Sequence, residues 1–329
     1  MNVNIGTMLE ARPAGDGMGK GLFATVDISV GTRILVESPI ILLRQSPTPF
    51  REFCQAASSM DSDMNGLRDL HCNARLLNEH LPGNILAQIR SEDPQNTIDF
   101  RDDSLMDLIR LYATYYTNAV TIIEDGEDVG SAVFRTFSNV NHSCKPNVFS
   151  IFNTKTNQQT VYAGWNIKAG QQILISYFGG NEDFMTCEQR LEQTRRDWGF
   201  TCACEACLGS RITDPERERM GLLKKRLDQS IKNWPPDDHS ARQALALEVV
   251  QEAKELLRLM EEAGVGYWKF RQIHGCKSYQ DCSRYNMFLG NQAEAVRYAK
   301  QYREIEEVYY SEDGIDLAWM DQIGLRIPE

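Results

Sequence analysis

The sequence predicts an α+β protein in which a β-rich region is interrupted by helices and then followed by an all-α region. Short apolar runs separated by glycine turns occur at 17–43 and again at 147–177, a pattern typical of strands. Apolar residues at helical spacing dominate 44–127 and the chain from about 215 onward. The two β-rich stretches are therefore expected to form one domain around a helical insertion.

The first β-rich stretch reads GMGKGLFATVDISVGTRILVESPIILL. Gly31 and Thr32 form a turn signal, and the RILVES segment that follows alternates apolar and polar side chains. The insertion contains SLMDLIRLYATYYTNAVTII, in which Leu105, Leu108 and Leu111 recur at helical spacing. We expect short strands up to about residue 43 and helices after it.

The second β-rich stretch contains NVFSIF, QTVYAGWNI and QQILISY, and a charged helix is expected at 183–197. In the last region, Leu245, Val249, Ala253 and Leu256 form one amphipathic stripe. This stripe predicts a small all-α domain beside the β-rich one.

The bulk composition limits the class of protein. The chain has 329 residues, 42% of them hydrophobic, which is enough for two domains or for one domain with large insertions. A net charge of −11 argues against direct binding to nucleic acid or to an anionic membrane, and suits a basic protein partner. No signal peptide and no membrane span are predicted, so we expect an intracellular protein of the cytoplasm or nucleus, and a monomer. Nine cysteines in such a compartment favour metal binding over disulfides.

Three of these cysteines lie within six residues, as Cys202, Cys204 and Cys207. Their side chains point in different directions along the chain, so they can converge only around a central atom. A structural zinc ion takes four ligands, and one is missing locally. A redox Cys-x-x-Cys motif would need the start of a helix in a thioredoxin-like context, whereas this segment follows a helix. Zinc is the stronger prediction.

A second string, NHSCKPNV at 141–148, lies between two strand patterns. Each of its polar side chains suits a ligand, a nucleophile or a helix cap, and the string alone does not choose among these roles.

In combination, GKGLFAT, NHSCKPN, GQQILISY and GFTCACEAC resemble the motifs of SET-domain lysine methyltransferases with a post-SET zinc site. The helical C-terminal region is similar to that of the multigene SET proteins of filamentous fungi and, more loosely, of SMYD-type enzymes. The chain departs from SMYD-type proteins because 44–127 lacks the paired cysteines of a MYND finger, and Gly179 stands where relatives often have an acidic residue.

The resemblance implies a β-rich SET fold with a pseudoknot, in which the C-terminal segment passes through a loop. It implies Cys144 as the fourth zinc ligand. The implied regions are a first SET part at 1–43, a helical insertion at 44–130, a second SET part at 131–180, a post-SET zinc segment at 181–210 and a helical domain at 211–329.

The resemblance also assigns candidate site residues. Tyr177 is the expected catalytic residue and also contacts the methyl donor, S-adenosylmethionine. Phe200 is expected to stack on the adenine, and Trp198 and Phe134 are expected to line the acceptor channel. The remaining donor-binding residues are Lys20, Gly21, Asn118, Ser138, Asn141 and His142.

The expected reaction is methyl transfer to a neutral amine held in line with the donor. A lysine must lose its proton first, and a narrow apolar channel beside a cationic donor favours this loss. The predicted function is therefore a protein-lysine N-methyltransferase acting on a histone or on another protein. Two alternatives are a SET-fold enzyme of small-molecule metabolism with an altered acceptor site and a non-catalytic SET binding module.

Overall fold

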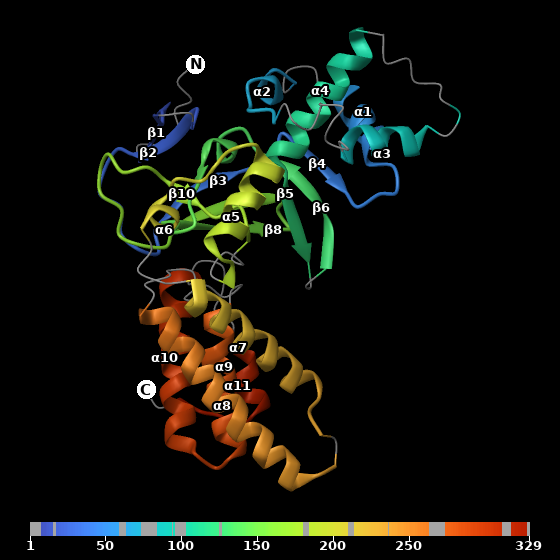
Figure 1. Ribbon diagram of the computed structural model, residues 1–329. Coiled ribbons are helices and arrows are strands. Elements are labelled where there is room, and N and C mark those ends of the chain that lie inside the picture. Colours follow the sequence, from blue (N-terminus) through green and yellow to red (C-terminus); the bar gives the residue numbers. More distant parts are fainter. Residues whose placement is uncertain are drawn as a thin grey trace.

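The computed structural model describes residues 8–15, 18–58, 64–73, 84–93, 95, 103–124, 127–179, 184–209, 214–235, 237–262, 274–310 and 317–327. In these ranges a β-rich part with several helices at its edge lies above an all-α region, as Figure 1 shows. The predicted α+β class is confirmed. No helix in the described ranges combines the length and the apolar character needed to cross a membrane.

The β-rich part consists of four small sheets. Its strands are β1 (Leu9–Pro13), β2 (Lys20–Ala24), β3 (Arg33–Glu37), β4 (Ile41–Arg44), β5 (Val120–Glu124), β6 (Glu127–Val133), β7 (Asn141–His142), β8 (Val148–Asn153), β9 (Gln158–Ala163) and β10 (Leu174–Ile175). The sheets have the orders β1-β2, β3-β9-β8, β4-β6-β5 and β10-β7. Only β7 and β10 pair in parallel; they place the 141–148 string beside the strand that leads to Tyr177.

The insertion packs on the β4-β6-β5 sheet. Its helices are α1 (Pro49–Ser58), α2 (Met64–Arg68), α3 (Asn84–Glu92) and α4 (Asp103–Asn118). The aromatic rings of Phe53, Tyr112 and Tyr115 form a buried cluster that also contains Ile41 of β4 and Val133 of β6. This cluster joins the insertion to the SET part.

Helical structure in the insertion ends earlier than the sequence-based limit of 130. Helix α4 stops at Asn118, and 120–133 forms the hairpin of β5 and β6. Gly130 has a φ of +149°, and a Cβ there would lie 2.2 Å from the Leu43 carbonyl oxygen. The β-branched run from Val120 to Ile123 therefore continues as strand, with a glycine at the irregular point of the pair.

The segment between the β-rich part and the all-α region begins with α5 (Cys187–Gln193). It continues as a π-helical turn at Thr194–Trp198 and ends with the short helix α6 (Glu205–Leu208). Helix α5 starts with a capping box, in which Thr186 and Gln189 satisfy each other's backbone N–H groups. Gly199, with a φ of +79°, ends the π turn and reverses the chain toward Cys202.

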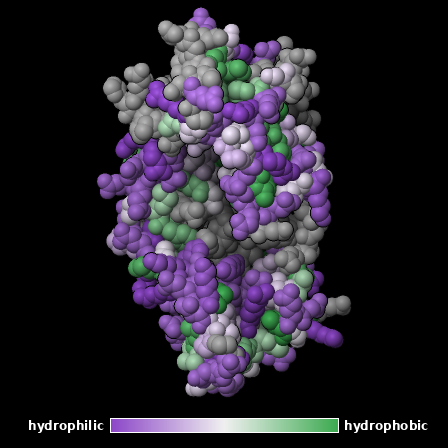
Figure 2. All heavy atoms as spheres, turned by 90° about the vertical axis from the view of Figure 1, so that its right-hand side faces the viewer, coloured by the Kyte–Doolittle hydropathy of each residue, from purple (hydrophilic) through white to green (hydrophobic). Residues whose placement is uncertain are grey.

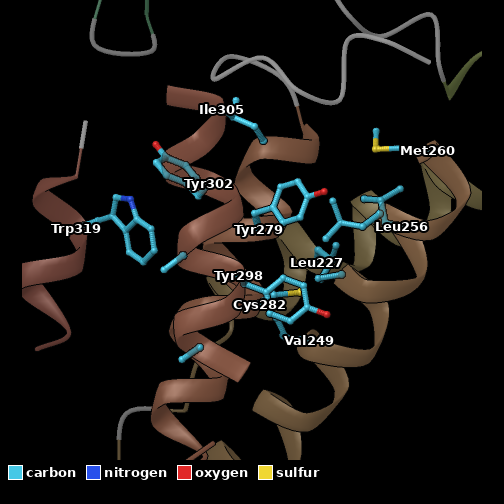
Figure 3. Packing of buried hydrophobic residues seen from close by; sticks show 14 of the residues in the cluster. Leu227, Val249, Leu256, Met260, Tyr279, Cys282, Tyr298, Tyr302, Ile305 and Trp319 are labelled. Carbon is cyan, nitrogen blue, oxygen red and sulfur yellow. The ribbon is translucent and has the colours of Figure 1, made fainter. Parts of the chain in front are cut away.

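The C-terminal region is all helical, as predicted. Its helices are α7 (Asp214–Lys232), α8 (His239–Glu262), α9 (His274–Phe288), α10 (Gln292–Tyr310) and α11 (Ala318–Gln322). Figure 3 shows Leu256, Met260 and Tyr279 among the side chains that meet between these helices. The same core includes Phe149 and Tyr162, stacked 5.3 Å apart on β8 and β9. The helical region is therefore packed directly on a SET strand pair.

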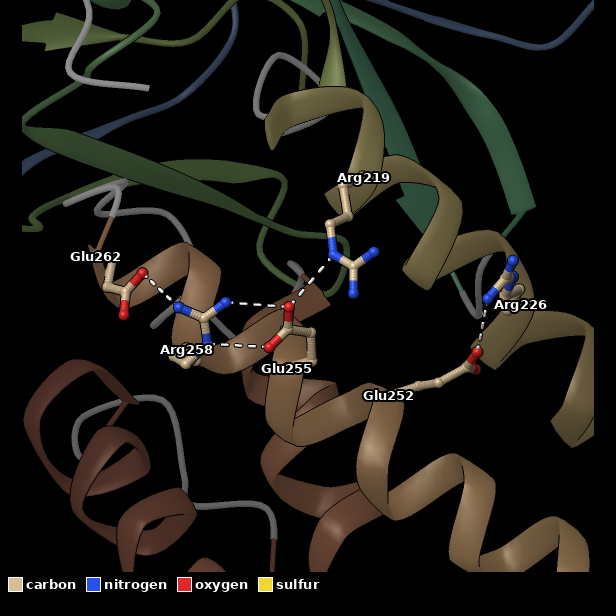
Figure 4. Close-up of polar contacts among 6 residues, drawn as sticks. All are labelled: Arg219, Arg226, Glu252, Glu255, Arg258 and Glu262. Carbon is tan, nitrogen blue, oxygen red and sulfur yellow. Dashed lines mark hydrogen bonds and ion pairs between the residues drawn. The ribbon is translucent and has the colours of Figure 1, made fainter. Parts of the chain in front are cut away.

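Charged side chains link α7 and α8 on the outside of this core. Arg219 reaches Glu255 at 3.3 Å and Arg226 reaches Glu252 at 3.5 Å, as Figure 4 shows. The arginines of both pairs are largely exposed and the glutamates less so. Surface pairs contribute about 0–1 kcal/mol each, so the apolar core provides most of the packing energy.

Candidate functional site

Four cysteines converge as predicted. The sulfur atoms of Cys144, Cys202, Cys204 and Cys207 all lie within 4.8 Å of one another. Cys144 Sγ is 3.6 Å from Cys207 Sγ and 4.0 Å from Cys202 Sγ. Four thiolates at about 2.3 Å from one tetrahedral zinc ion would be about 3.8 Å apart, so the cluster fits this metal.

Local structure brings these sulfurs together. Cys144 follows β7, and Cys204 precedes the first residue of α6, where its carbonyl oxygen accepts the N–H of Cys207 at 2.9 Å. Lys145 Nζ lies 3.0 Å from Glu205 Oε1 and ties the two segments outside the cluster. A hydrogen bond from the Cys144 thiol, followed by one from Cys202, lowers the pKa of Cys207 to about 6, and the pKa of Cys204 is lowered as well. Hydrogen bonds to neighbouring sulfurs raise the pKa values of Cys144 and Cys202, so zinc binding would have to release their protons.

His142 joins the cysteine cluster to Tyr177. The backbone N–H of Tyr177 donates to His142 Nδ1 at 3.1 Å, which assigns the ring proton to Nε2. Nε2 lies 3.3 Å from Cys144 Sγ and therefore donates to this sulfur. Burial lowers the pKa of His142 to about 4, so the ring is neutral at pH 7. Both ring nitrogens are engaged within the protein, which leaves the backbone and the ring face for any ligand contact.

Tyr177 lies in an aromatic cage. Its ring centroid is 5.2 Å from that of His142, 5.3 Å from that of Trp198 and 6.4 Å from that of Phe200. Its hydroxyl donates to the Val140 carbonyl oxygen at 2.9 Å. Burial raises the pKa of Tyr177, so the phenol stays protonated at neutral pH. The structure thus brings together four residues that the sequence predicted separately.

A second group of predicted residues meets around Gly21. Asn141 Nδ2 donates to the Lys20 carbonyl oxygen at 3.1 Å. A Cβ on Gly21 would lie 3.0 Å from Asn141 Nδ2 and only 2.5 Å from Gln172 Nε2. Because residue 21 is glycine, the side chains of Gln172 and Asn141 can pack closely against its backbone.

Ser138 Oγ and Gln172 Nε2 are among the nine buried polar side-chain atoms that have no hydrogen-bond partner within the described residues. Such orphaned atoms are rare in folded proteins, and a polar ligand is one way to satisfy them. Ser138 was predicted to bind the donor, whereas Gln172 was missed. Its one sequence signal is its place in the QQILISY strand, where glutamine normally reads as a polar surface residue.

Asn118 is engaged with the insertion. Its amide nitrogen donates to the carbonyl oxygens of His71 and Thr114, both at 2.7 Å. Asn73, two residues after His71, in turn donates to the Asp197 carbonyl oxygen at 3.3 Å. Asn118 therefore reaches the Trp198 segment through neighbouring residues, and its direct contact with a donor stays a prediction.

Phe134 is completely buried in the SET core, where it contacts the rings of Phe137 and Phe152. Trp198 is half-buried and touches the rings of Tyr177 and Phe178. Of the two predicted channel residues, Trp198 is partly exposed and its ring contacts Tyr177, whereas Phe134 has no exposed surface.

The comparisons with known proteins point to the same family as the sequence motifs. Residues 19–178 match the SET domain family model, so this part of the chain is similar to a SET domain. The chain is 27% identical to "Histone-lysine N-methyltransferase set5" of Schizosaccharomyces pombe, over 57% of this chain and 47% of that protein. It is 36% identical to "N-lysine methyltransferase SMYD2" of Homo sapiens, over 30% of this chain and 22% of that protein.

These alignments therefore span less than half of each relative. Among solved structures, the chain is similar to the SET domain of LSMT bound to lysine and AdoHcy, with 12% identity, 96% of this chain and 92% of that chain covered, and a TM-score of 0.38.

Proposed function

We propose that this protein is an S-adenosylmethionine-dependent protein-lysine N-methyltransferase. The observation that carries the proposal is the connected arrangement of the Tyr177 hydroxyl, the aromatic cage around it and the cysteine cluster behind His142. The curated relatives named as lysine methyltransferases support the same reaction class.

The donor site is formed by the residues around Gly21 and by Phe200. Ser138 Oγ and Gln172 Nε2, which lack protein partners, are available for its polar groups. When bound, S-adenosylmethionine supplies an electrophilic methyl carbon, and zinc supplies a cross-link between Cys144 and the 202–207 segment. The post-SET segment thereby holds Trp198 and Phe200 over the site.

Tyr177 orients the acceptor amine. Because its proton is donated to the Val140 carbonyl, the phenol oxygen presents its lone pairs and accepts an N–H from a neutral lysine amine. The rings of Trp198 and Phe178 exclude water beside it. Burial in this cage disfavours the ammonium form, so the lysine loses its proton on entry.

The substrate is a protein with an accessible lysine, and a basic segment such as a histone tail suits a chain with a net charge of −11. The surface is hollowed between the SET part and the helical region, and much of the rim seen in Figure 2 is hydrophilic. An intracellular location and a monomeric state stay predictions.

The test compares Tyr177→Phe with Tyr112→Phe. Tyr112 is also buried, but it lies in helix α4, where its hydroxyl donates to Gln88 over 3.3 Å. Loss of the site hydroxyl should lower the turnover number on the order of 100-fold. Donor affinity should stay within about two-fold of the wild-type value, because the hydroxyl acts mainly on the acceptor. Tyr112→Phe should match the wild type.

Methyl transfer is measured with labelled donor on an array of lysine peptides that includes histone tails, and donor affinity by calorimetry. Equal turnover of Tyr177→Phe and wild type would refute the catalytic role. Donor binding with no transfer to any peptide would favour a binding module, and transfer to small amines alone would favour a metabolic enzyme.

A further inference from the structure

Arg190 in helix α5 is one of the two largest fully buried side chains in the part of the chain that the structure describes. Its relative exposure is 1%. Burying a guanidinium costs several kcal/mol after relaxation, so a buried arginine needs a negative partner. Among the described residues, no carboxylate forms an ion pair with it.

The hydrogen bonds of Arg190 lead to the segment of the cysteine cluster. Nη1 donates to the Met185 carbonyl oxygen at 2.6 Å, and Nη2 donates to the Ala206 carbonyl oxygen at 3.0 Å. Ala206 directly precedes Cys207. Nε is buried and makes no hydrogen bond within the described residues. Carbonyl oxygens alone do not neutralise the charge of the side chain.

The cysteine cluster is the candidate negative partner. Nη2 of Arg190 donates to the carbonyl oxygen of the residue before Cys207, so the guanidinium lies one peptide unit from a proposed ligand. Four thiolates around one zinc ion carry a formal charge of −2. His142 Nε2 donates a hydrogen bond to the cluster at Cys144.

We propose that Arg190 is a positioning residue for the metal centre: its buried guanidinium compensates the charge of the zinc–thiolate cluster and fixes the Ala206–Cys207 segment as a ligand-bearing turn. The proposal rests on the proposed zinc site. It explains why a helix of the post-SET segment keeps a buried arginine that has no carboxylate partner among the described residues. It also places one fixed positive charge beside the Ala206–Cys207 peptide.

The variants Arg190→Gln and Arg190→Lys test this role against Arg217→Gln. Arg217 is equally buried, at 1% exposure, but lies in helix α7 outside the cysteine segment. Competition with a zinc chelator gives the zinc affinity of each full-length protein, and heat denaturation gives its stability. Groups that support metal ligands typically contribute 10- to 100-fold to metal affinity. We expect a loss of that size in Arg190→Gln, partial recovery in Arg190→Lys and no loss in Arg217→Gln.

A spectroscopic readout separates charge compensation from general destabilisation. In the cobalt-substituted protein, loss of the guanidinium makes the sulfur electrons easier to transfer to the metal. The thiolate-to-cobalt charge-transfer band should therefore move to lower energy in Arg190→Gln and stay in place in Arg217→Gln. If Arg190→Gln does not fold, Arg190→Lys still decides, because a weaker donor at the same position should shift the band by a smaller amount.

Zinc affinity within two-fold of wild type in folded Arg190 variants, together with an unmoved band, would overturn the role of Arg190 and leave the zinc site intact. An equal loss in Arg190→Gln and Arg217→Gln would also overturn it, since the effect would then be general. A wild-type protein that binds neither zinc nor cobalt would instead refute the metal site itself.

Discussion

The two halves of this molecule are held together in different ways. In the SET part, segments far apart in the sequence are tied by individual polar contacts: the Glu37 carboxylate accepts the backbone N–H groups of Thr136 and Phe137 at 2.8 and 2.9 Å. Cys144 meets Cys207 across 63 positions of the chain. In the helical region, one continuous apolar core joins helices that follow one another (Figure 3).

The proposed site residues lie in the SET part, the half that depends on individual polar contacts. The sheets there have only two or three strands, and β7 and β10 have two residues each, so they provide little packing of their own. A metal cross-link is the natural addition to such a structure. The helical region needs none, because one continuous apolar core holds it together.

Zinc removal should have the largest effect on hydrogen-exchange protection. The SET part should lose protection and the helical region should keep it. Metal binding to structural sites in small zinc domains is worth about 10–16 kcal/mol at pH 7, so its loss should release the 200–207 segment and the 141–144 string. Hydrogen exchange of the chelated protein should show lost protection there and intact protection in α8 and α9. Replacing Cys207 by Ser should reproduce this pattern, and Cys72→Ala in the insertion should not. Loss of protection across both halves would show that they unfold as one unit.

Truncation of a buried side chain in the helical core should have the next largest effect, and this effect should fall on the helical region. Leu256 is 1% exposed, and Leu256→Ala should lower the free energy of unfolding by about 2–5 kcal/mol because it leaves a cavity. Leu247 lies on the same helix and is 51% exposed, so Leu247→Ala should cost little. Chemical denaturation with hydrogen exchange measures both. Unchanged zinc content in Leu256→Ala is part of the prediction, and zinc release would contradict the independence of the halves.

The smallest effect concerns pH and the helical region alone. Burial raises the pKa of Asp281 to about 6, although Lys277 and Arg284 act in the opposite direction and Asp228 acts in the same direction. The folded protein therefore holds this proton in a range where the unfolded chain has released it, so stability falls as the pH rises from about 4 to about 6 and stays lower above that. Asp281→Asn should raise the free energy of unfolding by about 1–3 kcal/mol at pH 7 and leave it unchanged at pH 4.

Thermal unfolding at the two pH values measures this change. An equal gain at pH 4 and pH 7 would show that the amide improves packing, and no gain at either would show that Asp281 is ionised at little cost. The measurement sharpens the comparison because Asp281 lies in the helical region.

The sequence predicted the parts of the site that follow from spacing or from motif order. Three cysteines within six residues required a common centre, and the structure brings Cys144 to them. Arg190 and Gln172 were not predicted, because an arginine on a charged helix and a glutamine at a strand start both read as surface residues. Only the tertiary structure buries them.

The end of the insertion shows a related limit. Apolar residues recur at helical spacing from Leu105 to Tyr116, and the apolar run VTII follows. The hydrophobic periodicity of so short a run fits a helix and a strand equally well. Antiparallel pairing of β5 with β6 decides for strand, and β6 in turn pairs with β4, a contact across about 90 positions that no local pattern reports.

The central claim is that the cysteine cluster holds the post-SET segment over a donor site next to Tyr177. Calorimetric titration with S-adenosylmethionine, before and after zinc is extracted from the same preparation and then restored, tests it most directly. We predict saturable binding of one donor per chain, loss of binding without zinc and recovery when zinc is returned. Binding of full strength in the zinc-free protein, or none in the zinc-loaded one, would contradict the account.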